Sequence, residues 1–222
     1  MVSFVIPITV LVLCGISTIL FVQDTNEHPC RSGIEPPASL STKPVIAYSC
    51  IMVVATFVVS VVFVILFKEL DVFATLKRMI LLCVIWPLAY IDYKTYRIPN
   101  TFILYGLICR AVLIPIELMF NPYFRVDIIS ELIAAAALFA AALLCAVCMR
   151  GSIGAGDMKL FLVMGIFLGL EAIWSAMFLS LLVSFVAVIY LLVTKKKSKK
   201  DVIPFGPAIV IGVYLSVCLM GG

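Results

Sequence analysis

The sequence predicts an all-α polytopic membrane protein with about eight transmembrane helices. Hydrophobic residues make up 64% of the chain and charged residues only 13%, whereas about a quarter of a soluble domain is charged. The mean hydropathy of +1.25 agrees. In lipid every backbone amide must be satisfied within the chain, so long apolar runs become helices. The net charge of +4 is too small and too scattered to indicate binding of nucleic acid.

Five apolar runs have the length that a spanning helix needs, about 20 residues. They cover 4–22, 45–67, 101–120, 128–149 and 172–193. The first run resembles a signal peptide in position, but it lacks a basic start and exceeds the usual apolar length of about 7–15 residues. We therefore interpret it as a retained span.

Three shorter helices complete the count of eight: 76–91, 158–169 and 207–220. The stretch 160–193 is too long for one span, and a break is expected at Gly165, Gly169 or Glu171. A helix that stops early leaves its end in a hydrated pocket below the membrane surface. The first two of these helices are therefore expected to be short.

Two aspartates stand where apolar segments meet a break in the pattern. Asp92 follows the helix 76–91, and Asp157 follows Gly154 and Gly156. A carboxylate at that depth is costly unless it has a partner or a function. Two of them indicate an acid/base pair, as in an aspartic protease. The alternatives are an ordinary charged connection for Asp92 and a helix N-cap for Asp157.

The residues around these aspartates suggest room for a substrate. Gly154 and Gly156 are expected to let a substrate backbone come close and to adopt positive φ. A third tract, Pro204-Phe205-Gly206-Pro207, leads into the last helix. Its two prolines predict a rigid, extended loop that offers unpaired backbone groups. The alternative is a plain turn between helices.

The distribution of Lys and Arg predicts the orientation of the chain. Eleven lie in alternate loops that we expect on the cytoplasmic side: Arg31, Lys43, Lys94, Arg97, Arg150, Lys159 and five lysines within 195–200. Four are expected on the opposite side: Lys68, Lys77, Arg78 and Arg125. Both aspartates then lie at the cytoplasmic face.

Together the three tracts resemble the type IV prepilin and preflagellin leader peptidases, the GxGD membrane aspartic peptidases. The matching features are Asp92 followed by Arg97-Ile98-Pro99-Asn100, the tract Gly154-Ala155-Gly156-Asp157-Met158-Lys159, and Pro204–Pro207, in the family's order. The resemblance covers about 76–222 and implies a six-helix catalytic core there. By their apolar runs and charges, residues 1–75 are expected to form two N-terminal transmembrane helices with a short cytoplasmic loop. It also implies cleavage of a short basic leader from prepilin-like precursors at the cytoplasmic face of the cell membrane.

The resemblance implies that Asp92 and Asp157 are catalytic. Further residues would bind substrate or shape the site: Gly154, Gly156, Lys159, Arg97, Pro99, Asn100, Pro204, Phe205, Gly206 and Pro207. Lys159 and Arg97 would orient substrate carboxylates or pair with the aspartates, or else reach the membrane surface. The expected partners are precursors with a basic leader and a hydrophobic helix, together with membrane lipid. No cofactor is expected.

One departure concerns zinc. Many bacterial members carry a cytoplasmic insertion with two CxxC pairs that bind zinc, associated with N-methylation of the product. The corresponding loop 23–44 contains only His28 and Cys30, too few for the usual four-ligand site. We therefore expect no metal site and no N-methyltransferase activity. The Cys145/Cys148 pair lies in an Ala/Leu-rich helix, which favours a packing role.

Two alternatives remain open. Another GxGD intramembrane protease, resembling signal peptide peptidase or presenilin, would have tyrosine before the first aspartate, where this chain has Ile91. An ion- or proton-coupled transporter would use the aspartates as ligands. Transporters usually contain paired repeats with broken helices, and no repeat is visible here.

Overall fold

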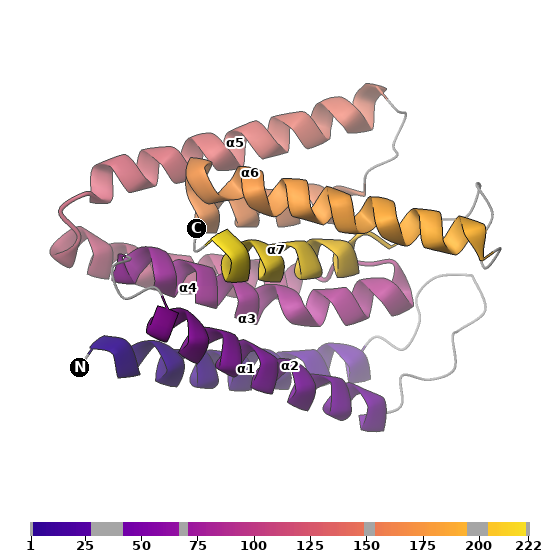
Figure 1. Cartoon of the computed structure of the whole chain (residues 1–222), viewed down its shortest axis with the longest axis horizontal. Coiled ribbons are helices and arrows are strands. Elements are labelled where there is room, and N and C mark those ends of the chain that lie inside the picture. Colours follow the sequence, from indigo (N-terminus) through magenta and orange to yellow (C-terminus); the bar gives the residue numbers. More distant parts are fainter. Residues whose placement is uncertain (1, 28–41, 67–70, 149–153, 195–203, 221–222) are drawn as a thin grey trace. The chain divides into compact units, whose positions relative to one another are not determined.

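The structure is a computed structural model, and it describes residues 2–27, 42–66, 71–148, 154–194 and 204–220. Throughout this part of the chain every regular element is a helix (Figure 1). The helices are α1 (Val2–Glu27), α2 (Thr42–Leu66), α3 (Val72–Thr95), α4 (Asn100–Phe120), α5 (Phe124–Cys148), α6 (Ala155–Val193) and α7 (Gly206–Met220). Six are long and apolar enough to cross a membrane, and α7 is a shorter apolar helix of 15 residues. The predicted fold class is confirmed.

Helix α3 is longer than the apolar run that predicts it. It has 24 residues, so the prediction of a short helix at 76–91 is wrong. The polar residues 92–95 continue the helix because none of them is a helix breaker. The end of an apolar run therefore does not have to be the end of the helix. The helix ends where Tyr96 adopts a left-handed φ of 51° and donates its N–H to the carbonyl of Asp92 at 2.9 Å. Asp92 therefore lies in the last turn of α3.

Helix α6 is broken at Gly169, which has φ 64° and ψ −176°. Glycine is almost the only residue that adopts this backbone conformation. The break releases the amide of Leu170, which donates a hydrogen bond to the hydroxyl of Ser130 in α5 at 2.9 Å. The break predicted within this stretch is confirmed. With α6 counted as two segments, the described part of the chain contains eight helical segments.

The chain packs into two compact units. Unit 1 contains Met1–Pro87 and Pro99–Asp127, and unit 2 contains Leu88–Ile98 and Ile128–Gly222. Helix α3 contributes to both, because the division falls after Pro87. This packing does not test the predicted functional division into 1–75 and 76–222, which stays a prediction.

Unit 1 has an aromatic core formed by α1, α2 and α3. The rings of Phe21 and Trp86 meet edge to face, with centroids 5.6 Å apart, and both side chains are fully buried. The hydroxyl of Tyr48 donates to the carbonyl of Trp86 at 2.9 Å. Between α1 and α3 the thiols of Cys14 and Cys83 are 3.3 Å apart, and both are free cysteines. Buried thiols of this kind behave as small apolar groups.

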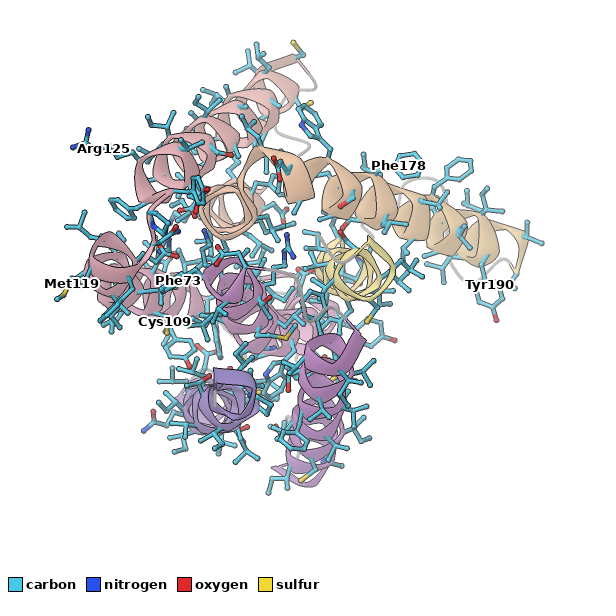
Figure 2. All side chains as sticks on the ribbon, turned by 60° about the vertical axis from the view of Figure 1, so that its left-hand side comes forward. Phe73, Cys109, Met119, Arg125, Phe178 and Tyr190 are labelled. Atoms are coloured by element: carbon cyan, nitrogen blue, oxygen red, sulfur yellow. The ribbon has the colours of Figure 1, made fainter. Side chains whose placement is uncertain are left out.

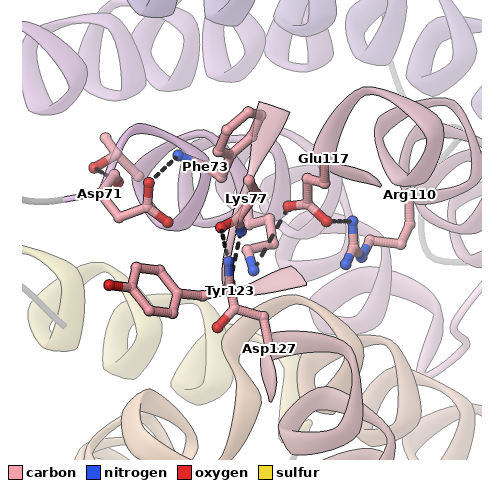
Figure 3. A network of polar contacts seen from close by, with 9 residues as sticks. Asp71, Phe73, Lys77, Arg110, Glu117, Tyr123 and Asp127 are labelled. Carbon is pink, nitrogen blue, oxygen red and sulfur yellow. Dashed lines mark hydrogen bonds and ion pairs between the residues drawn. The ribbon is translucent and has the colours of Figure 1, made fainter. Parts of the chain in front are cut away.

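A buried charge cluster joins α3 to α4 within unit 1 (Figure 3). The carboxylate of Glu117 lies 2.7 Å from Arg110 Nη1 and 3.6 Å from Lys77 Nζ. Burial of a charge is costly unless an opposite charge compensates it, and here the two helices supply both signs. Lys77 and Arg78 are buried. The count of Lys and Arg that predicts the orientation treats both as charges at the membrane surface, which they are not. The orientation of the chain stays a prediction.

Unit 2 is built on close helix packing at small residues. A Cβ on Gly165 of α6 would overlap the backbone of Ala135 in α5, and a Cβ on Gly212 of α7 would overlap the backbone of Ser180. Such contacts matter in lipid, where helices associate through packing and not through exclusion of water. Further along α6, Phe178 and Tyr190 project outward and are more than half exposed (Figure 2). This face is suited to lipid.

Candidate active site

Asp92 is a buried carboxylate held by a backbone amide from far along the chain. Asp92 is 6% exposed. The N–H of Gly206, the first residue of α7, donates a hydrogen bond to its Oδ2 at 2.7 Å. The amides of a helix's first turn have no partner within the helix and are available for such contacts. Because a hydrogen bond to a charged group contributes about 1.5–3 kcal/mol, this amide fixes the orientation of the carboxylate.

The position of Gly206 admits no larger residue. A Cβ there would stand 2.8 Å from both Oδ2 and Cβ of Asp92, which is closer than real contacts of this kind. The preceding Phe205 packs its ring edge to face on Phe161 of α6, with centroids 6.1 Å apart. The tract 204–207 therefore contacts α3 and α6 at once. Its Pro204 and Pro207 are half-buried on either side.

Asp157 lies in the first turn of α6, in the same unit as Asp92. It is half-buried, and its Oδ2 would lie 3.4 Å from a Cβ placed on Gly154, so the carboxylate turns back over the start of the helix. The helix dipole favours a negative charge at this end. Asp157 and Asp92 are close enough for their charges to repel each other.

Two interacting carboxylates can carry out acid–base chemistry. Like charges at close range cannot both ionise easily, so such a pair tends to hold one proton between them. One carboxylate can then accept a proton while the other donates one, which is the requirement for general acid–base catalysis. Within the described residues no three side chains of His, Cys, Asp or Glu gather in a way that could hold a metal ion. His28 and Cys30 lie outside the described residues.

The sequence predicts positive φ at Gly154 and Gly156, and this prediction is wrong at both positions. Gly154 is the extended N-cap of α6, with φ −69° and ψ 147°, and Gly156 lies within the first helical turn. In the described part of the chain the glycine with positive φ is Gly169. Gly156 has another reason to lack a side chain: a Cβ would stand 2.9 Å from the Cβ of Ile98.

Ile98 belongs to the tract 97–100 that matches the family, but it is not among the predicted site residues, and the structure places it against Gly156. Its contact partner Gly156 lies far along the chain, and the one local signal is its place before Pro99, which favours extended backbone. Of the other predicted residues, Arg97 is half-buried and Lys159 is exposed, while Pro99 is the N-cap of α4 and Asn100 its first residue, both in unit 1. The roles of these four residues stay predictions.

Comparison with known proteins identifies a family. Residues 79–192, just over half of the chain and including both aspartates, match the type IV leader peptidase family. A region of 85 residues is 35% identical to the prepilin leader peptidase/N-methyltransferase of Bacillus subtilis (strain 168), and it covers 38% of this chain but only 34% of that relative. No solved structure matches the chain. By the family match, this chain belongs to the type IV leader peptidase family.

Proposed function

We propose that the chain is a membrane-embedded aspartic endopeptidase that removes the short basic leader from prepilin-like precursors at the cytoplasmic face of the cell membrane. The observation that carries the proposal is the hydrogen bond from the Gly206 amide to the buried Asp92, in the same unit as Asp157 at the start of α6. Membership of the type IV leader peptidase family supports the same reaction.

The reaction proceeds by acid–base hydrolysis. A water molecule between the carboxylates loses a proton to the ionised aspartate, and its oxygen attacks the scissile carbonyl. The protonated aspartate donates a hydrogen bond to that carbonyl and stabilises the developing oxyanion. When the tetrahedral intermediate collapses, a proton passes to the leaving amine. The contact from Gly206 to Oδ2 orients Asp92 throughout, which leaves its Oδ1 to face the water.

The burial of Asp92 suits this chemistry, because electrostatic interactions are stronger where water is excluded. The half-buried position of Asp157 suits it as well, since a hydrolase must admit water and a peptide strand. In this proposal the precursor's leader lies on the exposed Gly154 side of Asp157.

A transporter that uses the aspartates as cation ligands is the second candidate. A buried cation site would require several oxygen ligands around one point. Within the described residues, however, no three side chains of His, Cys, Asp or Glu gather around one point. This favours hydrolysis. Among GxGD proteases, the family match favours leader peptidase over the presenilin type.

The proposal includes peptidase activity without N-methyltransferase activity. The relative from Bacillus subtilis is named for both, but the match covers about a third of it. Hydrolysis by two carboxylates requires neither a metal ion nor S-adenosylmethionine. The purified chain should therefore cleave with neither added, and a chelator should leave the rate unchanged.

Coexpression with a type IV prepilin precursor tests the proposed function. The expected result is a shift of the precursor to higher mobility that disappears with Asp157→Asn. The control is Asp71→Asn in unit 1, where asparagine can still accept the hydrogen bond from the Phe73 amide. An unshifted precursor with the unaltered chain at normal membrane levels, across several precursors, would contradict the proposal.

A further inference from the structure

We propose that Ile98 is a positioning residue: it packs on Gly156 and so holds Asp157 at its working separation from Asp92. This role rests on the proposed function. It is distinct from the roles of the aspartates, because Ile98 contacts the backbone of α6 and takes no part in the proton transfers.

The contact is formed by the stiff part of the Ile98 side chain. A Cβ on Gly156 would stand 2.9 Å from Ile98 Cβ, 3.5 Å from Cγ1 and 3.7 Å from the backbone nitrogen. A β-branched side chain has restricted rotation at χ1, so it cannot swing aside as the end of a long side chain could. Gly156 is bonded directly to Asp157. Any displacement of this contact is therefore passed to the aspartate.

The loop between α3 and α4 presents Ile98 in a fixed direction. Tyr96 is in the left-handed region at φ 51°, and its N–H binds the carbonyl of Asp92 at 2.9 Å. Such a conformation costs a bulky residue about 1–2 kcal/mol and persists only where surrounding structure requires it. Pro99 has φ −67° and biases Ile98 toward extended backbone.

These contacts form one short path from Asp92 to the residue that precedes Asp157. It begins at the carbonyl of Asp92, passes through the Tyr96 amide to Ile98, and ends on Gly156 beside Asp157. The Gly206 amide holds Asp92 from another direction. In this proposal the hydrogen bond on Asp92 and the Ile98 contact on Gly156 together set the separation of the aspartates, and a displacement of about 1 Å in such a site can cost about 10²-fold in rate.

Two substitutions, one that adds a Cβ at Gly156 and one that removes the side chain of Ile98, test the proposal alone and together. Gly156→Ala should lower kcat about 30-fold or more and change KM little, because geometry and not binding is disturbed. Ile98→Gly removes the clashing Cβ, and on its own it should lower kcat about 10-fold because the support is lost. The double variant should cleave about 10-fold faster than Gly156→Ala alone.

Two matched controls separate positioning from general loss of stability. Gly15→Ala adds a methyl group where no atom lies within 4 Å, and Ile108→Ala truncates an isoleucine that is 53% exposed on α4. Both should retain the kcat of the unaltered chain. Wild-type kcat in Gly156→Ala would overturn the proposal, and so would losses in the double variant that simply multiply.

A cross-link measures the contact without reference to activity. Ile98→Cys and Gly156→Cys, combined in a background without other cysteines, should form a disulfide on treatment with diamide. Fragments produced at a protease site inserted between α4 and α5 should then remain joined until reduction. The pair Ile98→Cys and Phe178→Cys is the control and should not cross-link.

The two experiments distinguish failure of the inference from failure of the proposed function. Cleavage by the unaltered chain, with neither cross-link nor rescue, overturns the role of Ile98 and leaves the peptidase proposal intact. A cross-link in a chain that cleaves no precursor overturns the proposed function, and with it the catalytic consequence assigned to Ile98.

Discussion

Asp92 shows which features of a site residue can be predicted from the sequence and which depend on contacts from distant parts of the chain. A carboxylate at either end of an apolar run is costly enough to stand out in the sequence, and so both aspartates could be singled out as candidates. The hydrogen bond from Gly206 could not, because the two residues are 114 positions apart. The same holds for Ile98 on Gly156, where local reasoning predicted a positive φ that the glycine does not adopt.

Gly206→Ala should impair catalysis more than substrate binding. The added Cβ would collide with Asp92 and displace its carboxylate, so kcat should fall about 10²-fold while KM changes little. The measurement is steady-state cleavage of a prepilin-like substrate by purified protein, with Gly15→Ala as the control. A kcat within about 3-fold of wild type would mean that Asp92 does not depend on this contact.

At the scale of helices, the apolar runs located the elements but not all of their ends. The break in α6 was predictable because a run of this length exceeds a bilayer and contains glycines. The end of α3 was not, because polar residues continue a helix as readily as apolar ones. The hydroxyl of Ser130, which binds the released amide of Leu170, was invisible in the sequence because it lies on another helix.

Gly169→Ala should destabilise the protein. With φ 64° and ψ −176°, this position costs a residue with a Cβ about 1–3 kcal/mol, and the substitution should lower the Tm in detergent. Gly15→Ala is again the matched control, because it lies in a regular helix with open space around it. An unchanged Tm in Gly169→Ala would indicate that α6 straightens without loss.

At the scale of the whole molecule, composition was sufficient to predict a polytopic membrane protein. The orientation is a weaker prediction, because Lys77 and Arg78 are buried and no longer count as surface charges. Without them, however, the remaining bias of Lys and Arg still favours a cytoplasmic position for the loops that flank both aspartates.

Labelling of single cysteines in a background without other cysteines should report this orientation. Cysteines at positions 94 and 152 should react only from the cytoplasmic side. A cysteine in place of Tyr123, which is 72% exposed between α4 and α5, should react only from the other side. Labelling of positions 94 and 152 from opposite faces would exclude a shared site.

The central claim is that Asp92 and Asp157 hydrolyse the leader as one unit, and the most direct measurement is a double-mutant comparison on purified protein. Asp92→Ala and Asp157→Ala should each reduce cleavage of a prepilin-like substrate by about 10⁴-fold, and the double variant should be no slower than either. Each variant must first show the far-UV circular dichroism and Tm of a folded chain. Substantial turnover in either single variant, or a double variant slower by the product of the two losses, would contradict a shared catalytic site.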